Sequence, residues 1–456
     1  MLITNTTVVT CDAGRRVHYG AALAVDGDRI SDIGPSGELE ARYPAAERLD
    51  GCGKAVFPGL VNCHTHLLAT ADRGILEDFG FPTTLRFPTT GRGMLDEEGR
   101  NVFGLLGALE AIRSGTTTML EISNDIPSYA DSLAATGMRL FLAENINDID
   151  DARFEQGHYE YSTEKLEAGL RRSEDLISGW DGAESGRVRC MVSPHAPELC
   201  SPDLLRQSVD MADRHDLRST IHLSQSHKEI EGVMRMRGVR PTQYLFANGL
   251  LSERLVVAHC RYVDDSEIAL LGQHSVAVSN NSAIAARRGA SAPASELQAA
   301  GCVLGMGSDN MAEDMVEVMR AGQFHERVRR NAEMWPAPED VLEWATIGGA
   351  RALGIADEVG SLEAGKKADL FMIDARRAHL VPTLRIVSGF VHQGQPADIT
   401  HVMVNGEWVM RDGRVLTIDE AEVIERAEEI GHAAWSRIVS ENPDVPFPVR
   451  LPPGPV

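Results

Sequence analysis

The segment Val56-Phe57-Pro58-Gly59-Leu60-Val61-Asn62-Cys63-His64-Thr65-His66 decides the fold of this chain. Its apolar run predicts a β-strand. Side chains at positions i and i+2 of a strand point to the same side, so His64 and His66 project into one space where the strand ends. Because neutral imidazole is a good ligand for zinc and similar cations, this pair predicts half of a metal site.

Three further apolar stretches end in a residue of the same ligand type. They are Ser219–His222, Leu255–His259 and Val303–Asp309. A single His-x-His pair arises often by chance on surfaces and in cores. Three strands that carry histidine, followed by one that ends in aspartate, are much more specific and predict a bound metal ion.

Strands and helices alternate through the middle of the chain, which predicts a parallel sheet. Eight strands are expected, at Val56–Cys63, Thr116–Ile122, Met138–Glu144, Arg187–Ser193, Arg218–His222, Arg254–His259, Ser275–Ser279 and Cys302–Ser308. Eight βα units in about 300 residues fit a TIM barrel, whose active site lies at the carboxyl ends of its strands. The metal-ligand candidates fall at the ends of the first, fifth, sixth and eighth strands.

Both ends of the chain read as short strands separated by turns, and such pieces can pair into one small β-sandwich. We therefore predict four parts: residues 1–57 and 366–418 as the two halves of the sandwich, 58–365 as the barrel, and 419–456 as a helix with an extended tail. The stretch Leu76–Leu95 has weak periodicity. It is either a plain surface loop or a lid or wall of the substrate pocket.

Composition narrows the class of protein. The chain has 456 residues, 43% of them hydrophobic and 24% charged, as in a soluble globular enzyme. Its formal net charge of −23 argues against nucleic acid as a partner, because phosphate binding needs a basic face. No stretch approaches the roughly 20 apolar residues of a membrane span. We expect a small-molecule substrate and a homo-oligomer.

The cysteines and the first residues indicate in which cellular compartment the protein is found. The seven cysteines are scattered without CxxC spacing, which suits reduced, buried thiols better than a disulfide framework. The start Met1-Leu2-Ile3-Thr4-Asn5 has no basic region and no long apolar region, so no signal peptide is evident. We expect a cytoplasmic protein.

These residues, in this order, make the chain resemble the amidohydrolase superfamily, in particular its cytosine-deaminase-like aminohydrolases and triazine chlorohydrolases. The resemblance covers nearly the whole length. It rests on Pro58–His66, Pro194-His195-Ala196-Pro197, Gly249-Leu250-Leu251, Ala258-His259-Cys260, Gly307-Ser308-Asp309 and Gly360–Leu370. These motifs are specific for the fold and for metal dependence, and much less so for the substrate.

The resemblance implies the metal ligands His64, His66, His222 and Asp309. It also implies that His259 holds or orients the attacking water and that His195 faces the substrate. Binuclear members of the superfamily bridge two metals with a lysine on the fourth strand. Arg187 to His195 contains no lysine, so one divalent ion is expected, zinc or alternatively iron(II).

One position departs from the family pattern. The subgroup carries His-x-x-Glu after the fifth strand, whereas this chain reads His222-Leu223-Ser224-Gln225. Glutamine cannot carry a proton at neutral pH, and a positioned acid–base group contributes about 10²–10⁴ in rate. A branch that resembles formimino-glutamate iminohydrolases also has glutamine there. Glu121 and Glu144 could replace the missing carboxylate, or each could simply pair with a neighbouring arginine.

The chemistry that follows is hydrolysis by a metal-activated water. The ion would lower the pKa of its water from near 16 towards roughly 7, and Asp309 and His259 could remove the second proton. Gln225 would act only as a hydrogen-bond partner. Among the other polar residues, His195 could instead cap a turn, while Arg73 and the pair Arg287-Arg288 either face the substrate or lie in solvent.

Three functions are compatible with this site. The first is a deaminase or chlorohydrolase that acts on a small nitrogen-rich heterocycle or amidine. The second is a hydrolase of a urea, a carbamate or an exocyclic amide, or an iminohydrolase, that uses Gln225 in place of the usual glutamate. The third is a catalytically inactive relative, which intact ligands disfavour. The sequence leaves the substrate open.

Overall fold

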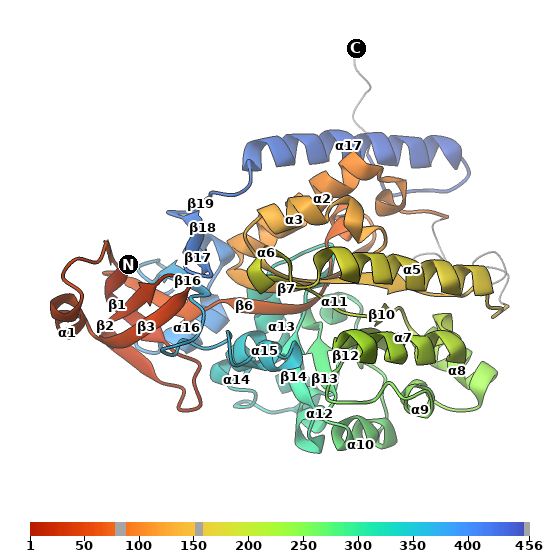
Figure 1. Ribbon diagram of the computed structural model, residues 1–456, viewed down its shortest axis with the longest axis horizontal. Helices are drawn as coiled ribbons and strands as arrows, with labels where there is room; N and C mark the ends of the chain where they lie inside the picture. The colour runs from red at the N-terminus through yellow and green to blue at the C-terminus, as the bar shows by residue number, and fades with distance from the viewer. Residues whose placement is uncertain (78–87, 151–157, 451–456) are drawn as a thin grey trace, which may run out of the picture.

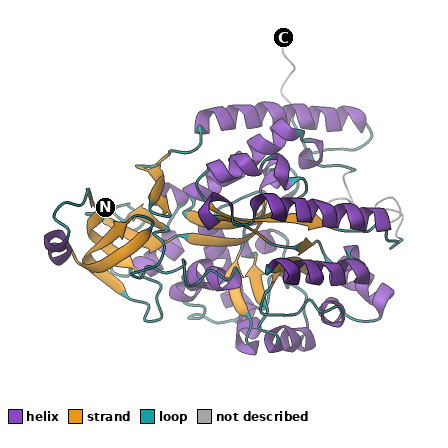
Figure 2. Cartoon of the chain, viewed as in Figure 1, coloured by secondary structure: helices purple, strands orange, loops and turns teal. Residues whose placement is uncertain are grey.

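The computed structural model describes residues 1–77, 88–150 and 158–450. It contains two sheets, which Figures 1 and 2 show side by side: a barrel surrounded by helices, and a β-rich part that holds the first strands and strands from late in the chain. The predicted α/β fold with a TIM barrel and a second, smaller β-sandwich is confirmed.

The barrel strands occupy the predicted positions. They are β6 (Leu60–His66), β7 (Thr116–Ser123), β8 (Arg139–Ile146), β9 (Val188–Cys190) with β10 (Ser193–Pro194), β11 (Ser219–Leu223), β12 (Leu255–His259), β13 (Ala277–Asn280) and β14 (Val303–Met306). All neighbours pair in parallel, and a bridge between Val192 and Ser219 joins the fourth strand position to the fifth. The two-residue strand β15 (Asp309–Asn310) pairs with the end of β6.

The apolar run Val56–Cys63, which the sequence predicted as one strand, belongs to two strands. Strand β5 (Lys54–Pro58) belongs to the smaller sheet, and the chain passes at Gly59 into β6 of the barrel. A Cβ atom at Gly59 would lie 2.0 Å from Oγ1 of Thr117, so no larger residue fits at this crossing. The sequence shows no break there because both strands are buried and apolar.

The smaller sheet combines both ends of the chain. Its other strands are β1 (Leu2–Val9), β2 (Val17–Asp26), β3 (Arg29–Pro35), β4 (Arg48–Asp50), β16 (Leu370–Asp374), β17 (Ile399–Val404), β18 (Glu407–Arg411) and β19 (Arg414–Val415). Strand β5 pairs with β1 on one side and with β16 on the other, so it joins the two ends. The boundaries after residues 57, 365 and 418 stay predictions.

Helices cover the barrel, and α17 lies across α2 (Figure 1). Their bounds are α1 (Ser36–Arg42), α2 (Glu97–Arg113), α3 (Ala130–Ala135), α5 (Thr163–Trp180), α6 (Ala183–Gly186), α7 (Pro202–His215), α8 (His227–Arg237), α9 (Pro241–Ala247), α10 (Asp265–Gln273), α11 (Ser282–Arg287), α12 (Ala294–Ala300), α13 (Met315–Arg330), α14 (Pro338–Glu343), α15 (Gly349–Ala352), α16 (Ile386–Gln393) and α17 (Glu420–Glu441). Side chains cap several N-termini, for example Ser201 at α7 and Asp264 at α10.

Two further sequence predictions concern thiols and membranes. All seven cysteines lie in the described residues, and none forms a disulfide. Among the described helices none has the length and hydropathy to cross a bilayer.

A buried ion pair connects the barrel to the smaller sheet. Arg139, at the start of β8, donates from Nε to Oδ2 of Asp369 at 3.0 Å and from Nη2 to Oδ1 at 3.1 Å. The two side chains are 2% and 1% exposed. The Asp369 carboxylate also accepts from the backbone of Asn405 at 2.8 Å.

We expect Asp369→Asn to lower the free energy of unfolding by about 3–5 kcal/mol, because it leaves the Arg139 guanidinium buried without a countercharge. Denaturant titration measures this change. Asp374→Asn is the matched control, since Asp374 pairs with the half-exposed Arg377 at the other end of β16 and such pairs contribute about 1 kcal/mol or less. Equal losses of unfolding free energy in Asp369→Asn and Asp374→Asn would contradict the stabilising role of the buried Arg139–Asp369 pair.

Candidate metal centre and active site

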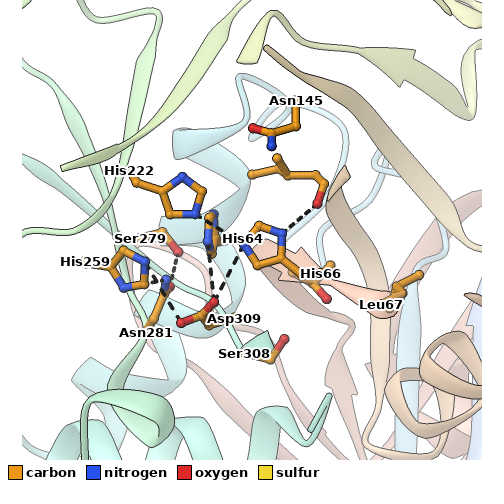
Figure 3. Close-up of polar contacts among 12 residues, drawn as sticks. His64, His66, Leu67, Asn145, His222, His259, Ser279, Asn281, Ser308 and Asp309 are labelled. Carbon is orange, nitrogen blue, oxygen red and sulfur yellow. Dashed lines mark hydrogen bonds and ion pairs between the residues drawn. The ribbon is translucent and has the colours of Figure 1, made fainter. Parts of the chain in front are cut away.

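Five side chains converge at the carboxyl ends of the barrel strands (Figure 3). His64 and His66 end β6, His222 lies on β11, His259 ends β12, and Asp309 follows β14. Their ligand atoms form two overlapping groups, His64 with His222 and His259, and His64 with His66 and Asp309, and within each group these atoms lie within 4.8 Å of one another. The geometry therefore brings together every residue that the sequence predicted around the ion.

Backbone carbonyls fix the tautomers of two of these rings. Nδ1 of His66 lies 2.6 Å from the carbonyl oxygen of Ile122, and Nδ1 of His222 lies 2.7 Å from that of His195. A carbonyl only accepts, so both Nδ1 atoms carry the proton and both Nε2 atoms present a lone pair. These two Nε2 atoms are 3.2 Å apart. Two lone pairs facing each other at this distance repel unless a cation lies beside them.

Buried polar atoms without partners support the same conclusion. In the described part of the chain, both ring nitrogens of His64, Nε2 of His259 and Oδ2 of Asp309 are buried and make no hydrogen bond. Burial, and next the neighbouring His222, hold the pKa of His64 and His259 well below 6.5, so these rings are neutral at pH 7. Neutral, desolvated imidazoles and a carboxylate are the donor set of a zinc-type site, and a metal ion fits here.

Asp309 faces three of the imidazoles. Its Oδ1 lies 3.7 Å from Nε2 of His66 and 3.9 Å from Nε2 of His64, and its Oδ2 lies 4.0 Å from Nε2 of His259. The backbone of Asp309 has φ 72° and that of His259 has φ 78°, left-handed values that are uncommon for residues other than glycine.

The turn into Asp309 leaves no room for a side chain at Gly307. A Cβ atom there would lie 2.6 Å from Oδ1 of Asn281 and 2.9 Å from Cβ of His64. Glycine at this position thus allows the strand ends to approach closely.

A short chain of hydrogen bonds orients His259. Ser279 donates to Oδ1 of Asn281 at 2.7 Å, and Nδ2 of Asn281 lies 3.3 Å from Nδ1 of His259. With Asn281 as donor, the His259 proton sits on Nε2, the atom that faces Asp309. His259 is therefore placed to donate a hydrogen bond near the cluster rather than to accept one.

The buried Glu313 connects the end of β6, which carries His64 and His66, to the segment that carries Asp309. Glu313 accepts hydrogen bonds through Oε2 from Oγ1 of Thr65 at 2.7 Å and from Oγ of Ser308. Thr65 stands between His64 and His66, and Ser308 precedes Asp309. The sequence analysis did not find Glu313, because its partner Thr65 lies 248 positions away along the chain.

Burial raises the pKa of Glu313 from its ordinary 4.5 to about 8. The folded protein therefore holds this proton at pH values where the unfolded chain has lost it, and stability should fall as pH rises from about 4.5 to about 8. We expect Glu313→Gln to remove this part of the decline, measured by denaturant titration of metal-free protein at several pH values. Glu317→Gln, on the exposed face of α13, is the control and should keep the wild-type dependence of stability on pH. If the stability of Glu313→Gln falls as steeply with pH as that of the wild type, the raised pKa does not belong to Glu313.

A cavity of about 400 Å³ opens above the cluster. Its lining includes His66, His222 and Asp309 at the base and His195 and Gln225 on the walls. Nδ2 of Asn145 lies 2.7 Å from Nδ1 of His195 and orients this ring. Arg288 also lines the cavity, whereas Arg73 does not, since its guanidinium contacts Glu110 and the carbonyl oxygen of Met311.

Gln225 is 4% exposed and is held through its backbone. Its N–H donates to Oε2 of Glu229 at 2.8 Å, and its carbonyl oxygen accepts from Arg261. Gln225 lines the cavity at the position where the family pattern has glutamate.

The two glutamates considered as replacements have other partners. Glu121 accepts hydrogen bonds from the backbone of Leu67 at 2.9 Å and from the Tyr129 hydroxyl at 2.7 Å. Glu144 accepts from Nε of Arg172 at 3.0 Å. Neither is among the residues that line the cavity.

Within the stretch Leu76–Leu95, which the sequence predicted as a loop, lid or pocket wall, residues 78–87 lie outside the described residues. Thr90, Arg92, Gly93 and Leu95, from its second half, line the cavity. Arg92 is thus a wall residue that sequence reasoning did not single out, and no periodicity or motif marks it.

Comparison with known proteins agrees with this geometry. A model of the amidohydrolase family matches residues 55–409. The chain belongs to the amidohydrolase family. A second model, the bacterial imidazolonepropionase-like composite domain, matches residues 21–46 in the smaller sheet.

Curated relatives of this amidohydrolase extend over nearly its whole length. A 5-methylthioadenosine/S-adenosylhomocysteine deaminase of Syntrophobacter fumaroxidans is 36% identical, over 94% of this chain and 97% of the relative. A 5'-deoxyadenosine deaminase of Methanothermobacter thermautotrophicus is 34% identical over the same shares.

Solved structures share the fold. A zinc-bound adenosine deaminase of Xanthomonas campestris superposes with a TM-score of 0.87 at 24% identity, over 96% of this chain and 98% of the other. A zinc complex of the atrazine chlorohydrolase of Arthrobacter aurescens gives 0.86 at 22%, over 94% and 99%. The amidohydrolase is a metal-dependent hydrolase that acts on C–N bonds, and its His/Asp cluster supports a single metal ion.

Proposed function

We propose that this amidohydrolase is a zinc-dependent deaminase that releases ammonia from an amino-substituted sp² carbon, with a 5'-modified adenine nucleoside as the first candidate substrate. The observation that carries the proposal is the cluster of neutral imidazoles and Asp309 at the base of a 400 Å³ cavity. Cavities of this size hold ligands as large as a nucleoside. The names of the curated relatives support the adenine nucleoside.

In this proposal His64, His66, His222 and Asp309 hold the ion. A divalent ion at this place supplies Lewis-acid chemistry and lowers the pKa of a water molecule to about 7. Four ligands from the ends of separated barrel strands match zinc, and iron(II) would suit them as well.

The remaining side chains act on water and substrate. Asp309, through its buried Oδ2, takes a proton from the attacking water and gives it to the leaving amino group. His259 donates a hydrogen bond from Nε2 to the oxygen of the attacking water and orients it. His195, oriented by Asn145, contacts the substrate on the opposite wall. Gln225 donates a hydrogen bond to the ring nitrogen next to the reacting carbon, without transferring a proton.

The test is ammonia release from metal-replete protein with 5'-methylthioadenosine, S-adenosylhomocysteine, 5'-deoxyadenosine, adenosine, and aminated pyrimidines, pterins and triazines. The proposal expects turnover of at least one adenine nucleoside. Ammonia from none of these compounds, with one metal ion bound per chain, would refute the proposal.

Gln225 favours a second candidate, a substrate whose leaving group departs without a proton donor. Chloride from a triazine is such a group, and a protonated amidine is a related case, because its charge activates the carbon and the proton taken from the water suffices for the amine to leave. Chloride release in the same panel, or ammonia from amidines alone, would select this candidate. A urea or carbamate substrate would instead release an amine and no ammonia.

Two further properties belong to the proposal. The six buried free thiols support a reducing compartment such as the cytoplasm. A homo-oligomeric state is also proposed, and light scattering of the purified protein tests it.

A further inference from the structure

Positive charge gathers around the cavity of a protein that is otherwise strongly acidic. The net charge of the chain is −23, yet Arg92, Arg100 and Arg288 all line this cavity. The carboxylates in the lining are Asp125 and Asp309. If Asp309 held a divalent ion, the ion would offset the charge of that carboxylate, and Asp125 would be the remaining carboxylate in the lining beside the three arginines.

The three arginines differ in what holds them. Arg100 donates to Oγ of Ser128 at 2.8 Å and to the carbonyl oxygen of Leu95 at 3.0 Å. These hydrogen bonds give Arg100 a structural role in the cavity wall. Nε of Arg92 lies 3.9 Å from Oδ2 of Asp72, a Coulomb contact rather than a hydrogen bond. Nη1 of Arg288 lies 3.7 Å from Oδ2 of Asp309.

Arg92 and Arg288 reach the cavity from elements far apart in sequence. Arg92 lies in the 3-10 turn Gly91–Met94 before α2, and Arg288 directly follows α11. The Arg288 side chain is only 10% exposed, so its charge is largely desolvated. Arg92 and Arg288 both lie in the lining of the same cavity. Two guanidinium groups that line one cavity give it a positive potential, which favours an anionic ligand.

We propose that Arg92 and Arg288 form an oxyanion subsite, so that the substrate carries a carboxylate or phosphate group in addition to the C–N bond that is hydrolysed. This inference rests on the proposed function and narrows its substrate class. Guanidinium groups bind both oxyanions through paired N–H donors. The subsite holds the anion beside the metal cluster while the reacting carbon lies over His66 and His222.

The first experiment measures anion binding without turnover. Inorganic phosphate and malonate are titrated calorimetrically into metal-loaded protein, and the two probes separate a phosphate from a carboxylate preference. We expect Arg92→Gln and Arg288→Gln each to weaken binding of the preferred anion about 10- to 100-fold. Arg287→Gln is the matched control, since Arg287 pairs with Glu317 at 3.0 Å. Metal content is measured in every variant, because Arg288 lies next to Asp309.

Unchanged anion affinity in Arg92→Gln would overturn the subsite, since the anion would then sit on the metal alone. A loss in Arg92→Gln with normal metal content supports it, whether or not Arg288→Gln also loses metal.

A second experiment compares matched substrates. S-adenosylhomocysteine differs from 5'-methylthioadenosine by a carboxylate-bearing group, and adenosine monophosphate differs from 5'-deoxyadenosine by its phosphate. If the subsite binds an anion, the anionic substrate of one pair should have a lower KM than its neutral counterpart. Arg92→Gln should abolish this difference in KM. Turnover of neutral nucleosides with no such advantage would overturn the subsite and leave the deaminase standing. Anion binding that depends on Arg92, with no nucleoside deaminated, would support the subsite and refute the adenine nucleoside as substrate.

Discussion

Asp309→Asn should remove the metal and reduce ammonia release more than about 10⁴-fold, because Asp309 is proposed both to bind the ion and to carry the proton. Asparagine is the right replacement here. The Asp309 backbone is left-handed, at φ 72°, and asparagine tolerates this conformation. The side chain also keeps its size, so the variant removes the charge without straining the turn.

Elemental analysis of protein purified without chelators measures the metal, and the panel assay measures ammonia. Asp265→Asn serves as the control, since Asp265 lies exposed at the start of α10. Full metal content together with wild-type turnover in Asp309→Asn would show that the ion and the proton transfer both depend on other residues.

Gln225→Glu should raise the rate of adenine-nucleoside deamination about 10²-fold, and up to about 10⁴-fold. The introduced carboxyl would be buried and would lie near Glu229, which accepts the Gln225 backbone N–H. Burial raises a carboxyl pKa, so the new group would keep its proton near neutral pH and act as the missing acid. The gain should disappear at high pH, where that carboxyl ionises.

Gln225→Met is the comparison, since it keeps the volume but donates no hydrogen bond and no proton, and we expect it to be slower than the wild type. Steady-state kinetics from pH 5 to pH 9, with metal content measured in parallel, separate the three proteins. A Gln225→Glu variant that holds its metal but turns over more slowly would indicate that glutamine is required by the native reaction, as the second candidate function demands.

The sequence was sufficient for the barrel and for the residues that meet at its centre. The strands are short apolar runs separated mostly by helical segments, and the ends of parallel strands meet at one edge whatever the intervening helices are. Thus His64, His222 and Asp309 could be placed together although up to 245 positions separate them. Their roles as ligands stay predictions.

The walls of the site could not be predicted in the same way. Arg92 comes from a stretch without periodicity, and Arg73, a candidate from sequence, contacts Glu110 instead. Glu313 contacts Thr65 only because the segment between β15 and α13 folds against the end of β6. Such side-chain contacts depend on packing between elements, for which local sequence carries no signal.

The passage from β5 to β6 at Gly59 has a consequence for engineering. Strand β5 runs through the middle of the smaller sheet and continues, after one residue, into the strand that bears His64 and His66. Removal of β1 (Leu2–Val9) from the N-terminus would strip a neighbour from β5 and weaken the support of these two histidines. Gene fusions and circular permutants should therefore keep this junction uncut and place new ends elsewhere.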